Sequence, residues 1–469
     1  MTQGSLRESI LSHLPYTPNA QQSQLIDVLA RFVVDDDLQS TVFMINGYAG
    51  TGKTSLTAAL VNALEDFGIK AVLLAPTGRA AKVFGNFSHH PAYTIHRHIY
   101  RSDLESGSFT SIKENKARNG TIFIVDESSM IDTSDNMSRT INLLDDLLQF
   151  VYSGHNTRLI FLGDPAQLPP VNSAADEGLY KALRQRFFHV IRAVLTSTVR
   201  QSAHSGILYN ATWLRRAMHK DIMPAPKIFV SMFDDVDVVE GADLADELQK
   251  CYSRYGMEET IIITRSNKRA VDYNIAVRNT LLEYTRLLSR GDMVMVAKNN
   301  YFWTKKVKGL EFIANGDMGV IEKVNGWEEF AGMEFADVEL CFPDHDDITI
   351  EAKANISGLV SDAPALSHDQ MRNLTLACMD NPEVYAPGTP DTARVVGLRN
   401  DPFYNALQLK YGYAVTCHKA QGGQWKAVFI DMGFLPDDSG NKEFYRWLYT
   451  AVTRASEKLY FVNPSLEVL

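Results

Sequence analysis

The segment Thr41–Thr54, TVFMINGYAGTGKT, constrains the fold of this chain more than any other stretch. Its residues from Gly47 to Thr54 fit the phosphate-loop pattern, in which a glycine is followed by four free positions and then by Gly-Lys-Thr. An apolar, β-rich run precedes the loop, and apolar residues recur at helical spacing after it, as far as Gly68. A strand, this loop and a helix in that order predict an α/β domain that binds a nucleoside triphosphate.

Each part of the loop has a chemical role in this prediction. Gly50 and Gly52 allow backbone amides to turn toward a phosphate, because neither residue has a side chain in the way. The start of the following helix adds free N–H groups and the positive end of the helix dipole. We expect Lys53 to reach the β- and γ-phosphates and the hydroxyl of Thr54 to coordinate Mg²⁺. The predicted nucleotide contacts in the loop are Gly47, Gly50, Thr51, Gly52, Lys53, Thr54 and Ser55.

Two later apolar runs also end in polar residues. Ile122–Val125 is followed by Asp126 and Glu127. Asp126 is placed to hold Mg²⁺ through water, and Glu127 could orient or deprotonate an attacking water. A solvated acidic pair is the alternative interpretation. After the run Leu159–Leu162, the amide of Gln167 could sense a γ-phosphate.

Glutamine and histidine clusters allow weaker inferences. A glutamine just before the predicted helix that contains Leu25 can bind an adenine edge through its amide, or can lie on the surface at a helix start. The segment His89–His98 holds several histidines but no cysteine or carboxylate at ligand spacing, which argues against zinc.

Composition narrows the class of protein. The chain has 469 residues, 45% of them apolar and 22% charged, enough for sizeable cores in about three domains. A net charge of −10 argues against a generally basic protein that coats nucleic acid. It does not exclude nucleic acid, because a local channel can be positive on an acidic protein. Four scattered cysteines, and no leader-like or membrane-spanning apolar run, predict a cytoplasmic protein.

The C-terminal half indicates a second α/β unit that is interrupted. It begins at residues 259–264, and from about Arg286 to Glu351 short apolar runs alternate with Gly/Asn turns, which is typical of a small barrel. Phe312–Asp317 is one of these runs. Residues 355–402 are irregular and contain prolines, and the α/β pattern resumes at Tyr411.

These motifs, in this order, resemble those of superfamily-one DNA helicases of the RecD-like and Dda-like branch. The resemblance rests on the joint pattern of GYAGTGKT, APTGRAAK, TIH, IFIVDESSM, FLGDPAQLPPV, VRQ, VTCHKAQG and YTAVTRA, and it covers about Tyr16 to Val462. It implies an α/β fold of two RecA-like domains with ATP and Mg²⁺ between them, a small pin insertion in the first domain and an SH3-like β-barrel insertion in the second. The expected boundaries are 1–98 and 121–196 for the first domain, 99–120 for the pin, 197–285 and 403–469 for the second domain, and 286–402 for the β-rich insertion.

The resemblance also implies roles for residues at matching positions. Gln22 is similar to the adenine-reading glutamine of the family, with Gln21 the weaker candidate, and Gln167 is similar to its γ-phosphate sensor. Arg200 and Arg454 resemble the two arginines that the second domain directs to the γ-phosphate. A planar guanidinium suits this position because it neutralises charge that develops in phosphoryl transfer.

Other matching positions concern DNA. Gln421 and Gly422 occupy positions that couple the nucleotide to DNA in the family, although the following Gly423 departs from its pattern. The family positions that line the single-strand track correspond to Pro76, Thr77, Thr94, His96, Thr416 and His418.

The activity implied by the resemblance is ATP-driven movement along single-stranded DNA, 5′ to 3′, with unwinding of forked duplex. ATP would close the two domains and hydrolysis would reopen them, with alternating grip on the DNA backbone. Two alternatives stay open at this point. One is a DNA-stimulated ATPase that acts as a clamp or loader without unwinding, and the other is an RNA-directed helicase of the same superfamily.

The segment Tyr100–Gly120 lies where this family has a β-hairpin pin at the duplex fork. It is polar, with turn residues at 106–108 and an apolar residue, Phe109, beside them. A ring at the tip of a pin can stack on the terminal base pair. We therefore predict that Phe109 contacts DNA, the alternative being a phenylalanine packed on its own domain.

Overall fold

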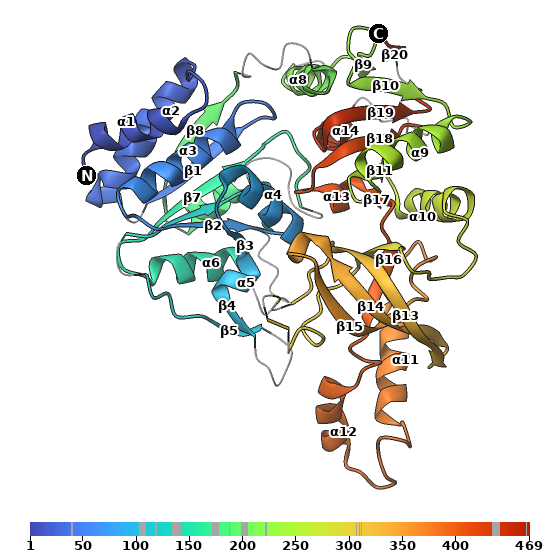
Figure 1. Cartoon of the computed structure of the whole chain (residues 1–469). Coiled ribbons are helices and arrows are strands. Elements are labelled where there is room, and N and C mark those ends of the chain that lie inside the picture. Colours follow the sequence, from blue (N-terminus) through green and yellow to red (C-terminus); the bar gives the residue numbers. More distant parts are fainter. Residues whose placement is uncertain are drawn as a thin grey trace.

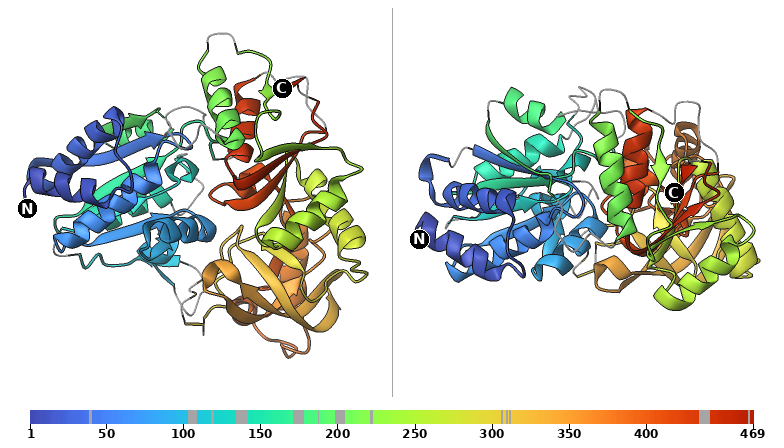
Figure 2. Two further views of the ribbon diagram at one scale, coloured as in Figure 1. Left: turned by 45° about the horizontal axis from the view of Figure 1, so that its top comes forward. Right: turned by 90° about the horizontal axis from the view of Figure 1, so that it is seen from above.

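The computed structural model describes residues 1–38, 41–102, 109–117, 120–133, 142–170, 178–186, 188–197, 205–220, 223–305, 307–308, 310, 312–433, 441–465 and 467–469. Two parallel sheets with packed helices lie side by side, and a small barrel adjoins the second sheet (Figures 1 and 2). The N-terminus lies on the outer side of the first unit and the C-terminus on the second (Figure 1).

The first sheet has six parallel strands in the order β3-β2-β6-β7-β1-β8. Strands that are covered on both faces are apolar throughout, so β1 is a continuous apolar sequence rather than an alternation of apolar and polar residues. Phe43 and Ile45 pack into the core layer on one face, while Val42 and Met44 pack into the layer on the other. The bounds are β1 (Thr41–Gly47), β2 (Ala71–Ala75), β3 (Ala92–Thr94), β6 (Ile122–Val125), β7 (Arg158–Gly163) and β8 (His189–Leu195).

Helices cover both faces of this sheet. One core layer receives side chains from the first three helices and from Phe84 of the fourth, and the other layer receives them from the last three. Asn19 and Thr77 cap the second and fourth helices by accepting backbone N–H groups. The bounds are α1 (Gln3–His13), α2 (Ala20–Val34), α3 (Lys53–Asp66), α4 (Gly78–Ser88), α5 (Ile95–Ile99), α6 (Leu143–Tyr152) and α7 (Gly178–Gln185).

An antiparallel strand pair leaves the first domain directly after α5. It consists of β4 (Tyr100–Ser102) and β5 (Phe109–Ile112), with Tyr100 opposite Ile112. This is the segment in which the sequence predicted a pin. The connection at 103–108 and the side chain of Phe109 lie outside the described residues.

The second sheet has five parallel strands in the order β10-β19-β18-β11-β17. Its strands are β10 (Val236–Val239), β11 (Thr260–Thr264), β17 (Ala414–Thr416), β18 (Trp425–Asp431) and β19 (Ala455–Val462). Its helices are α8 (Gly206–Met218), α9 (Leu244–Tyr255), α10 (Asn267–Ala276), α13 (Cys417–Ala420) and α14 (Lys442–Val452). A short parallel pair, β9 (Lys227–Ile228) and β20 (Glu467–Val468), joins the C-terminal end to this unit.

A closed five-stranded barrel interrupts the second unit. Its strands are β12 (Met293–Val296), β13 (Met318–Phe330), β14 (Met333–Phe342), β15 (Ile348–Asn355) and β16 (Leu407–Tyr411). β16 lies beyond residue 402, where we expected the insertion to end. The run Phe312–Asp317 is not one of the strands; among the described residues Ile313 forms only an isolated bridge with Asn300.

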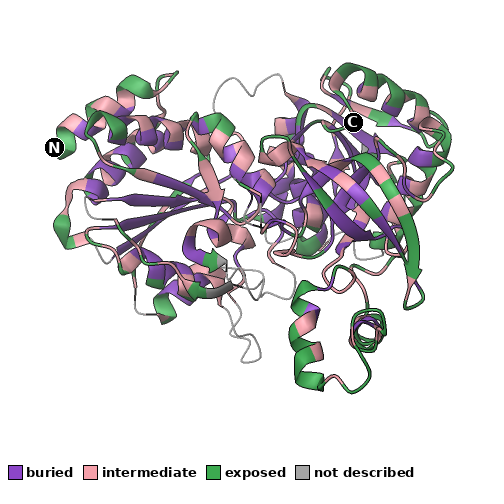
Figure 3. Cartoon of the chain, turned by 60° about the horizontal axis from the view of Figure 1, so that its bottom comes forward, coloured by how far each residue is buried: buried purple, intermediate pink, exposed green. Residues whose placement is uncertain are grey.

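Two helices fill the stretch that the sequence presented as irregular. α11 (His368–Met379) and α12 (Asp391–Gly397) project from the barrel (Figure 1). Both are largely exposed (Figure 3), because only a small apolar cluster that includes Leu374, Cys378 and Phe335 joins them to the barrel. A helix that buries so few apolar side chains leaves a weak periodic pattern in the sequence.

The predicted fold class is confirmed: an α/β chain of two RecA-like units with a small barrel inserted in the second. Among the described helices, none has the length and apolar character needed to cross a membrane.

Candidate functional site

The phosphate loop connects β1 to α3 and closes around Lys53. Gly52 caps α3 with φ of 81°, a left-handed conformation that glycine adopts at little cost. The ammonium group of Lys53 donates to the carbonyl of Gly47 and lies 3.3 Å from that of Tyr48. A Cβ at Gly47 would lie 2.6 Å from Cγ of Lys53, so only glycine fits there without displacing the lysine. The loop therefore holds a positive charge within a ring of backbone groups.

Asp126 and Glu127 follow β6, next to the loop. The Oδ1 atom of Asp126 accepts the amide of Glu127 at 2.8 Å. Burial, and then the charge of Glu127, raises the pKa of Asp126 to about 7. Glu127 has a left-handed backbone with φ of 49°, which is uncommon for a residue with a side chain.

Asp164 and Gln167 follow β7 and are both buried. Oδ2 of Asp164 lies 3.9 Å from Nζ of Lys53, and burial raises the pKa of Asp164. The Oε1 atom of Gln167 is buried and has no hydrogen-bond partner among the described residues. Because a buried amide oxygen without a partner costs free energy, this atom is suited to a ligand in the adjoining space.

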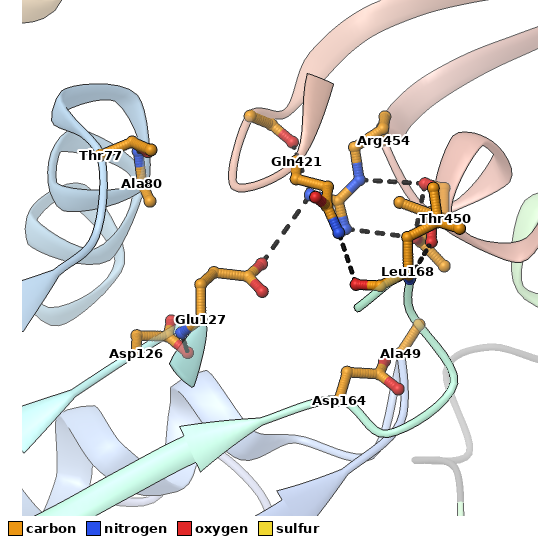
Figure 4. A network of polar contacts seen from close by, with 12 residues as sticks. Ala49, Thr77, Ala80, Asp126, Glu127, Asp164, Leu168, Gln421, Thr450 and Arg454 are labelled. Carbon is orange, nitrogen blue, oxygen red and sulfur yellow. Dashed lines mark hydrogen bonds and ion pairs between the residues drawn. The ribbon is translucent and has the colours of Figure 1, made fainter. Parts of the chain in front are cut away.

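The second domain contributes Arg454 and Gln421. The guanidinium of Arg454 donates to the carbonyls of Thr450 and Gly423, both at 3.0 Å, and Nη1 lies 3.8 Å from Oε1 of Glu127. Gln421 donates through Nε2 to the carbonyl of Leu168 at 2.7 Å. Figure 4 shows Arg454 and Gln421 directed from the second domain toward Glu127 and Leu168 of the first. The two domains thus meet through polar groups.

Gly422 lies against the start of α4. Its φ is 74°, and a Cβ there would lie 2.9 Å from Cβ of Ala80 and 3.2 Å from Oγ1 of Thr77. Both the backbone conformation and this close approach require glycine. The residue after Gln421 therefore brings the second domain into contact with a predicted DNA-binding residue.

A cavity of about 320 Å³ lies between these groups. Its walls come from the phosphate loop, from the ends of β6 and β7, and from the second domain. Predicted site residues that line it are Gly50, Gly52, Lys53, Thr54, Ser55, Asp126, Glu127, Gln167, Gly422 and Arg454. The structure therefore brings together most of the nucleotide-binding residues that we predicted.

The two candidate adenine-reading glutamines are both hydrogen-bonded within the protein. Gln22 is buried, and its Nε2 donates to the carbonyl of Thr51 in the phosphate loop at 3.0 Å. Gln21 is half-buried, and its Oε1 accepts the amides of Thr196 and Ser197, both at 3.0 Å. Gln22 thus supports the loop, and a role in adenine recognition stays a prediction.

The predicted DNA-binding residues lie at a different place from the cavity. Thr94 ends β3 and Thr416 ends β17, which are edge strands of the first and second sheets. Pro76 and Thr77 link β2 to α4, and His418 lies exposed on α13. Burial lowers the pKa of His96 to about 4, and its ring lies 6.0 Å from that of Phe312.

Two predicted residues are not placed. Arg200 lies outside the described residues, and so does the side chain of Phe109. Their predicted roles are therefore not tested by the structure.

The sequence did not single out three residues that the structure places at the domain boundary. Tyr449 donates to Asp164 at 2.7 Å and accepts the amide of Ala49 at 2.8 Å. Arg79 donates to the carbonyl of Gln424 at 2.9 Å and lies 4.1 Å above the ring of Trp425. All three, Tyr449, Asp164 and Arg79, stand inside motifs, but spacing along the chain does not show which side chains reach across a domain boundary.

The barrel also contacts the first domain. Its 3₁₀ turn η5 (Pro343–His345) carries Asp344, which lies 3.6 Å from Arg79 and 3.4 Å from Lys82 of α4. His345 lies 3.0 Å from Asp317, and a Cβ at Gly78 would touch both. The helix that begins beside Thr77 is therefore held by the barrel as well as by the second sheet.

Comparisons with known proteins match these motifs. Residues 19–222 match the AAA domain family, and residues 411–462 match the UvrD-like helicase C-terminal domain. The ATP-dependent RecD2 DNA helicase of Deinococcus radiodurans is 24% identical over 443 residues, 91% of this chain and 48% of the relative. The ATP-dependent DNA helicase PIF3 of Trypanosoma brucei brucei is 26% identical over 203 residues, 42% of this chain and 22% of that protein.

A solved Bacteroides Pif1 helicase in complex with ADP-AlF3 and single-stranded DNA is 16% identical, with a TM-score of 0.44, over 95% of this chain and 92% of that one. The chain spans about half the length of the RecD2 relative. The two family matches and the helicase relatives agree with the motifs found in the sequence. The chain is similar to superfamily-one helicases of the RecD/Pif1-like type.

Proposed function

We propose that this chain is an ATP-hydrolysing DNA helicase that moves 5′ to 3′ along single-stranded DNA and unwinds duplex. One observation carries the proposal: the cavity at the phosphate loop is lined by Lys53 and Glu127 of the first domain and by Arg454 of the second. A nucleotide between them would contact both domains. ATP binding and hydrolysis would then change how the domains sit relative to one another.

The residues present fit a nucleoside triphosphate with Mg²⁺. Lys53 offers a positive charge inside the loop, and the unpartnered Oε1 of Gln167 can accept a hydrogen bond from the attacking water. Thr54 and Asp126 would hold Mg²⁺. The ion, when bound, would neutralise charge on the phosphate oxygens, and it would favour the ionised form of Asp126, which burial disfavours.

The remaining groups would act on the transferred phosphoryl group. Glu127 would orient the attacking water and accept its proton. Arg454, joined by Arg200, would stabilise the negative charge that develops on the γ-phosphate oxygens. Arg454 already lies beside Glu127, so it would need little movement to reach a bound γ-phosphate.

DNA would lie across the edge strands of both sheets, along Pro76, Thr77, Thr94, His96, Thr416 and His418. Gly422 carries the link between the two sites, because it contacts the start of α4 while the preceding Gln421 binds the carbonyl beside Gln167. A shift of Gln167 toward the γ-phosphate would therefore move Gln421 and Gly422, and through Gly422 it would displace Thr77. The domain boundaries that we expected from the sequence remain part of this proposal, with β16 counted in the barrel.

The relatives support this activity, since the RecD2 and PIF3 proteins are named as ATP-dependent DNA helicases. The decisive experiment compares duplexes that carry either a 5′ or a 3′ single-stranded tail. Unwinding of the 5′-tailed duplex alone, with ATPase stimulated by DNA, is the expected result. Stimulation without strand separation would indicate the clamp or loader, and stronger stimulation by RNA would indicate an RNA-directed enzyme.

A further inference from the structure

A second and larger cavity opens on the first domain, apart from the cavity at the phosphate loop. Its volume is about 930 Å³, and it shares no lining residue with the nucleotide cavity. The walls come from β2, β3, α5, β4 and the segment after β5. Ligand sites in proteins typically measure roughly 300–1,000 Å³, so the cavity can hold more than a single small ion.

The lining is strongly basic. It includes one carboxylate, Glu114, and five cationic side chains: Lys70, Arg97, Arg101, Lys113 and Lys116. The chain as a whole has 56 acidic and 46 basic side chains, so the sign of charge here is opposite to that of the protein. Such a local reversal is the electrostatic signature of a site for a polyanion.

Several of these cations are held in place by neighbours. The guanidinium of Arg97 lies 5.3 Å from the ring centre of Tyr93, which stacks on His98 at 6.1 Å. Nζ of Lys113 donates to the carbonyl of Arg97 at 2.6 Å. Burial, and then the charges of Lys113 and Lys70, lowers the pKa of His98 to about 4. Arg97 and Lys113 are therefore held in place within the wall, whereas Lys70, Arg101 and Lys116 are exposed around them.

The cavity lies on the other side of α5 from the predicted single-strand track. On this short helix His96 turns its ring toward Phe312 of the barrel segment, at 6.0 Å, whereas Arg97 and His98 line the cavity. Successive helical residues point about 100° apart, which accounts for this division. The strand pair β4–β5 begins here, since Arg101 of β4 and Lys113 after β5 are both in the lining.

We propose that this cavity binds the phosphate backbone of the DNA strand that is excluded from the track during unwinding. The inference rests on the proposed function. At a fork divided by β4–β5, one strand passes His96, and the other leaves on the opposite side of α5, where the cations lie. Binding there would keep the separated strands apart and hinder their re-pairing ahead of the enzyme.

The test uses a triple variant of exposed cations, K70E/R101E/K116E. The matched control is K250E/R254E/K323E, which changes the net charge equally at exposed positions on α9 and β13. Binding is measured by fluorescence anisotropy without nucleotide, over a range of salt concentrations. The three probes are a fork with both arms single-stranded, the same duplex with only the 5′ arm, and the 5′ arm alone.

We expect the cavity variant to bind the two-armed fork about tenfold more weakly than the control, with a salt slope smaller by about 2, because about three phosphate contacts are lost at roughly 0.7 each on a single strand. Binding of the other two probes should stay within about twofold of the control. As a direct check, 4-thiothymidine in the excluded arm should crosslink to peptides that contain Lys113, and 4-thiothymidine in the 5′ arm should not.

Three results would overturn the inference. Equal weakening with the single-armed duplex would assign the cavity to the duplex, and equal weakening with the 5′ arm alone would assign it to the tracking strand. If the cavity variant bound the two-armed fork as tightly as the control, the cavity would not be a DNA-binding site. ATPase stimulation of the parent protein by the 5′ arm is measured in parallel. Its absence would contradict the proposed function, whereas the binding comparison does not depend on hydrolysis.

Discussion

The hydroxyl oxygen of Tyr449 lies 2.7 Å from Oδ2 of Asp164, and the two residues belong to different domains. The same hydroxyl accepts the amide of Ala49 in the phosphate loop at 2.8 Å. Tyr449 is 1% exposed, so both hydrogen bonds are made away from water. One oxygen atom therefore joins α14, the end of β7 and the loop that would hold the phosphates.

Removing this hydroxyl in Tyr449→Phe should lower both stability and turnover. The carboxylate of Asp164 and the amide of Ala49 would each lose a buried partner, which typically costs roughly 1–3 kcal/mol. We also expect a several-fold lower kcat for ATP, because the loop and α14 would no longer be held together. Denaturant unfolding and steady-state ATPase assays measure the two effects.

Tyr445→Phe is the matched control for that variant. Tyr445 lies on the same helix, and its hydroxyl donates to the carbonyl of Pro224, which does not line the cavity. Its loss should reduce stability but leave kcat unchanged. A Tyr449→Phe protein with the parental kcat would limit that hydroxyl to a structural role.

Lys53→Ala should abolish ATP turnover while the protein stays folded. Lys53 contacts loop carbonyls and is not part of an apolar core, so its loss removes a phosphate contact rather than packing. Glu127→Gln should instead keep ATP binding and lose hydrolysis, since the amide retains the shape of the side chain but cannot accept the proton. Circular dichroism, nucleotide binding and ATPase rates distinguish these outcomes. Hydrolysis by Lys53→Ala near the parental rate would contradict our assignment of the loop.

Arg454→Ala and Arg200→Ala should each slow hydrolysis strongly without an equal loss of ATP affinity. Arginines that reach a transferred phosphoryl group act mainly on the transition state and contribute on the order of 10³-fold or more. Single-turnover hydrolysis and binding of a fluorescent ATP analogue separate the two quantities. Exposed ion pairs contribute little, so a change below about twofold would indicate a surface role for that arginine.

The ion pair between His345 and Asp317 should make stability depend on pH. Burial lowers the pKa of His345, but the hydrogen bond and charge of Asp317 outweigh it and hold the pKa above its ordinary value. The folded protein then binds this proton more tightly than the unfolded chain. The stabilisation is therefore complete below the unfolded pKa, near 6.5, and is lost as pH rises through the folded pKa. In unfolding experiments, the difference in stability between the parent and His345→Gln should shrink as pH rises from about 6 to about 8.5. A difference that is independent of pH would show that folding leaves the pKa of this histidine unchanged, and a difference that grows as pH rises would show that the histidine is neutral in the folded protein.

Phe109→Ala should lower duplex unwinding and leave DNA-stimulated ATPase and single-strand translocation close to the parent. Phe109 begins β5, outside both sheets that carry the predicted motor residues. Loss of a stacking ring should cost roughly 1–3 kcal/mol of contact with the terminal base pair. If all three activities fall together, Phe109 has a structural role. If none changes, another residue separates the strands.

The fold was predictable wherever the sequence carried a strong local pattern. The run Thr41–Ile45, the loop after it and the helix containing Leu56 and Leu60 combine an apolar strand, a glycine-rich turn and helical periodicity, and the structure has all three. The two helices between β15 and β16 were missed because they bury few side chains. No local pattern marks the full length of the long strand β13, since its outer half, residues 325–330, is mostly exposed and lacks an apolar run.

The individual residues of the candidate site could be predicted from the sequence, but the hydrogen bonds that join the two domains could not. Lys53, Glu127 and Arg454 stand in motifs, and the structure brings all three to one cavity. The bonds from Tyr449 to Ala49 and from Gln421 to Leu168 join residues hundreds of positions apart. Neither spacing nor composition encodes such pairs, because they depend on how two independently formed units dock.

At Glu127 the backbone is left-handed, with φ of 49°, so the residue that is best for stability differs from the residue that is best for hydrolysis. A side chain in that region costs roughly 1–2 kcal/mol, and glycine would avoid the cost. Glycine there has no carboxylate to accept a proton from water. Screens that select variants of this chain only for thermal stability should therefore favour inactive replacements at residue 127. A search for a more stable enzyme has to keep glutamate at that position.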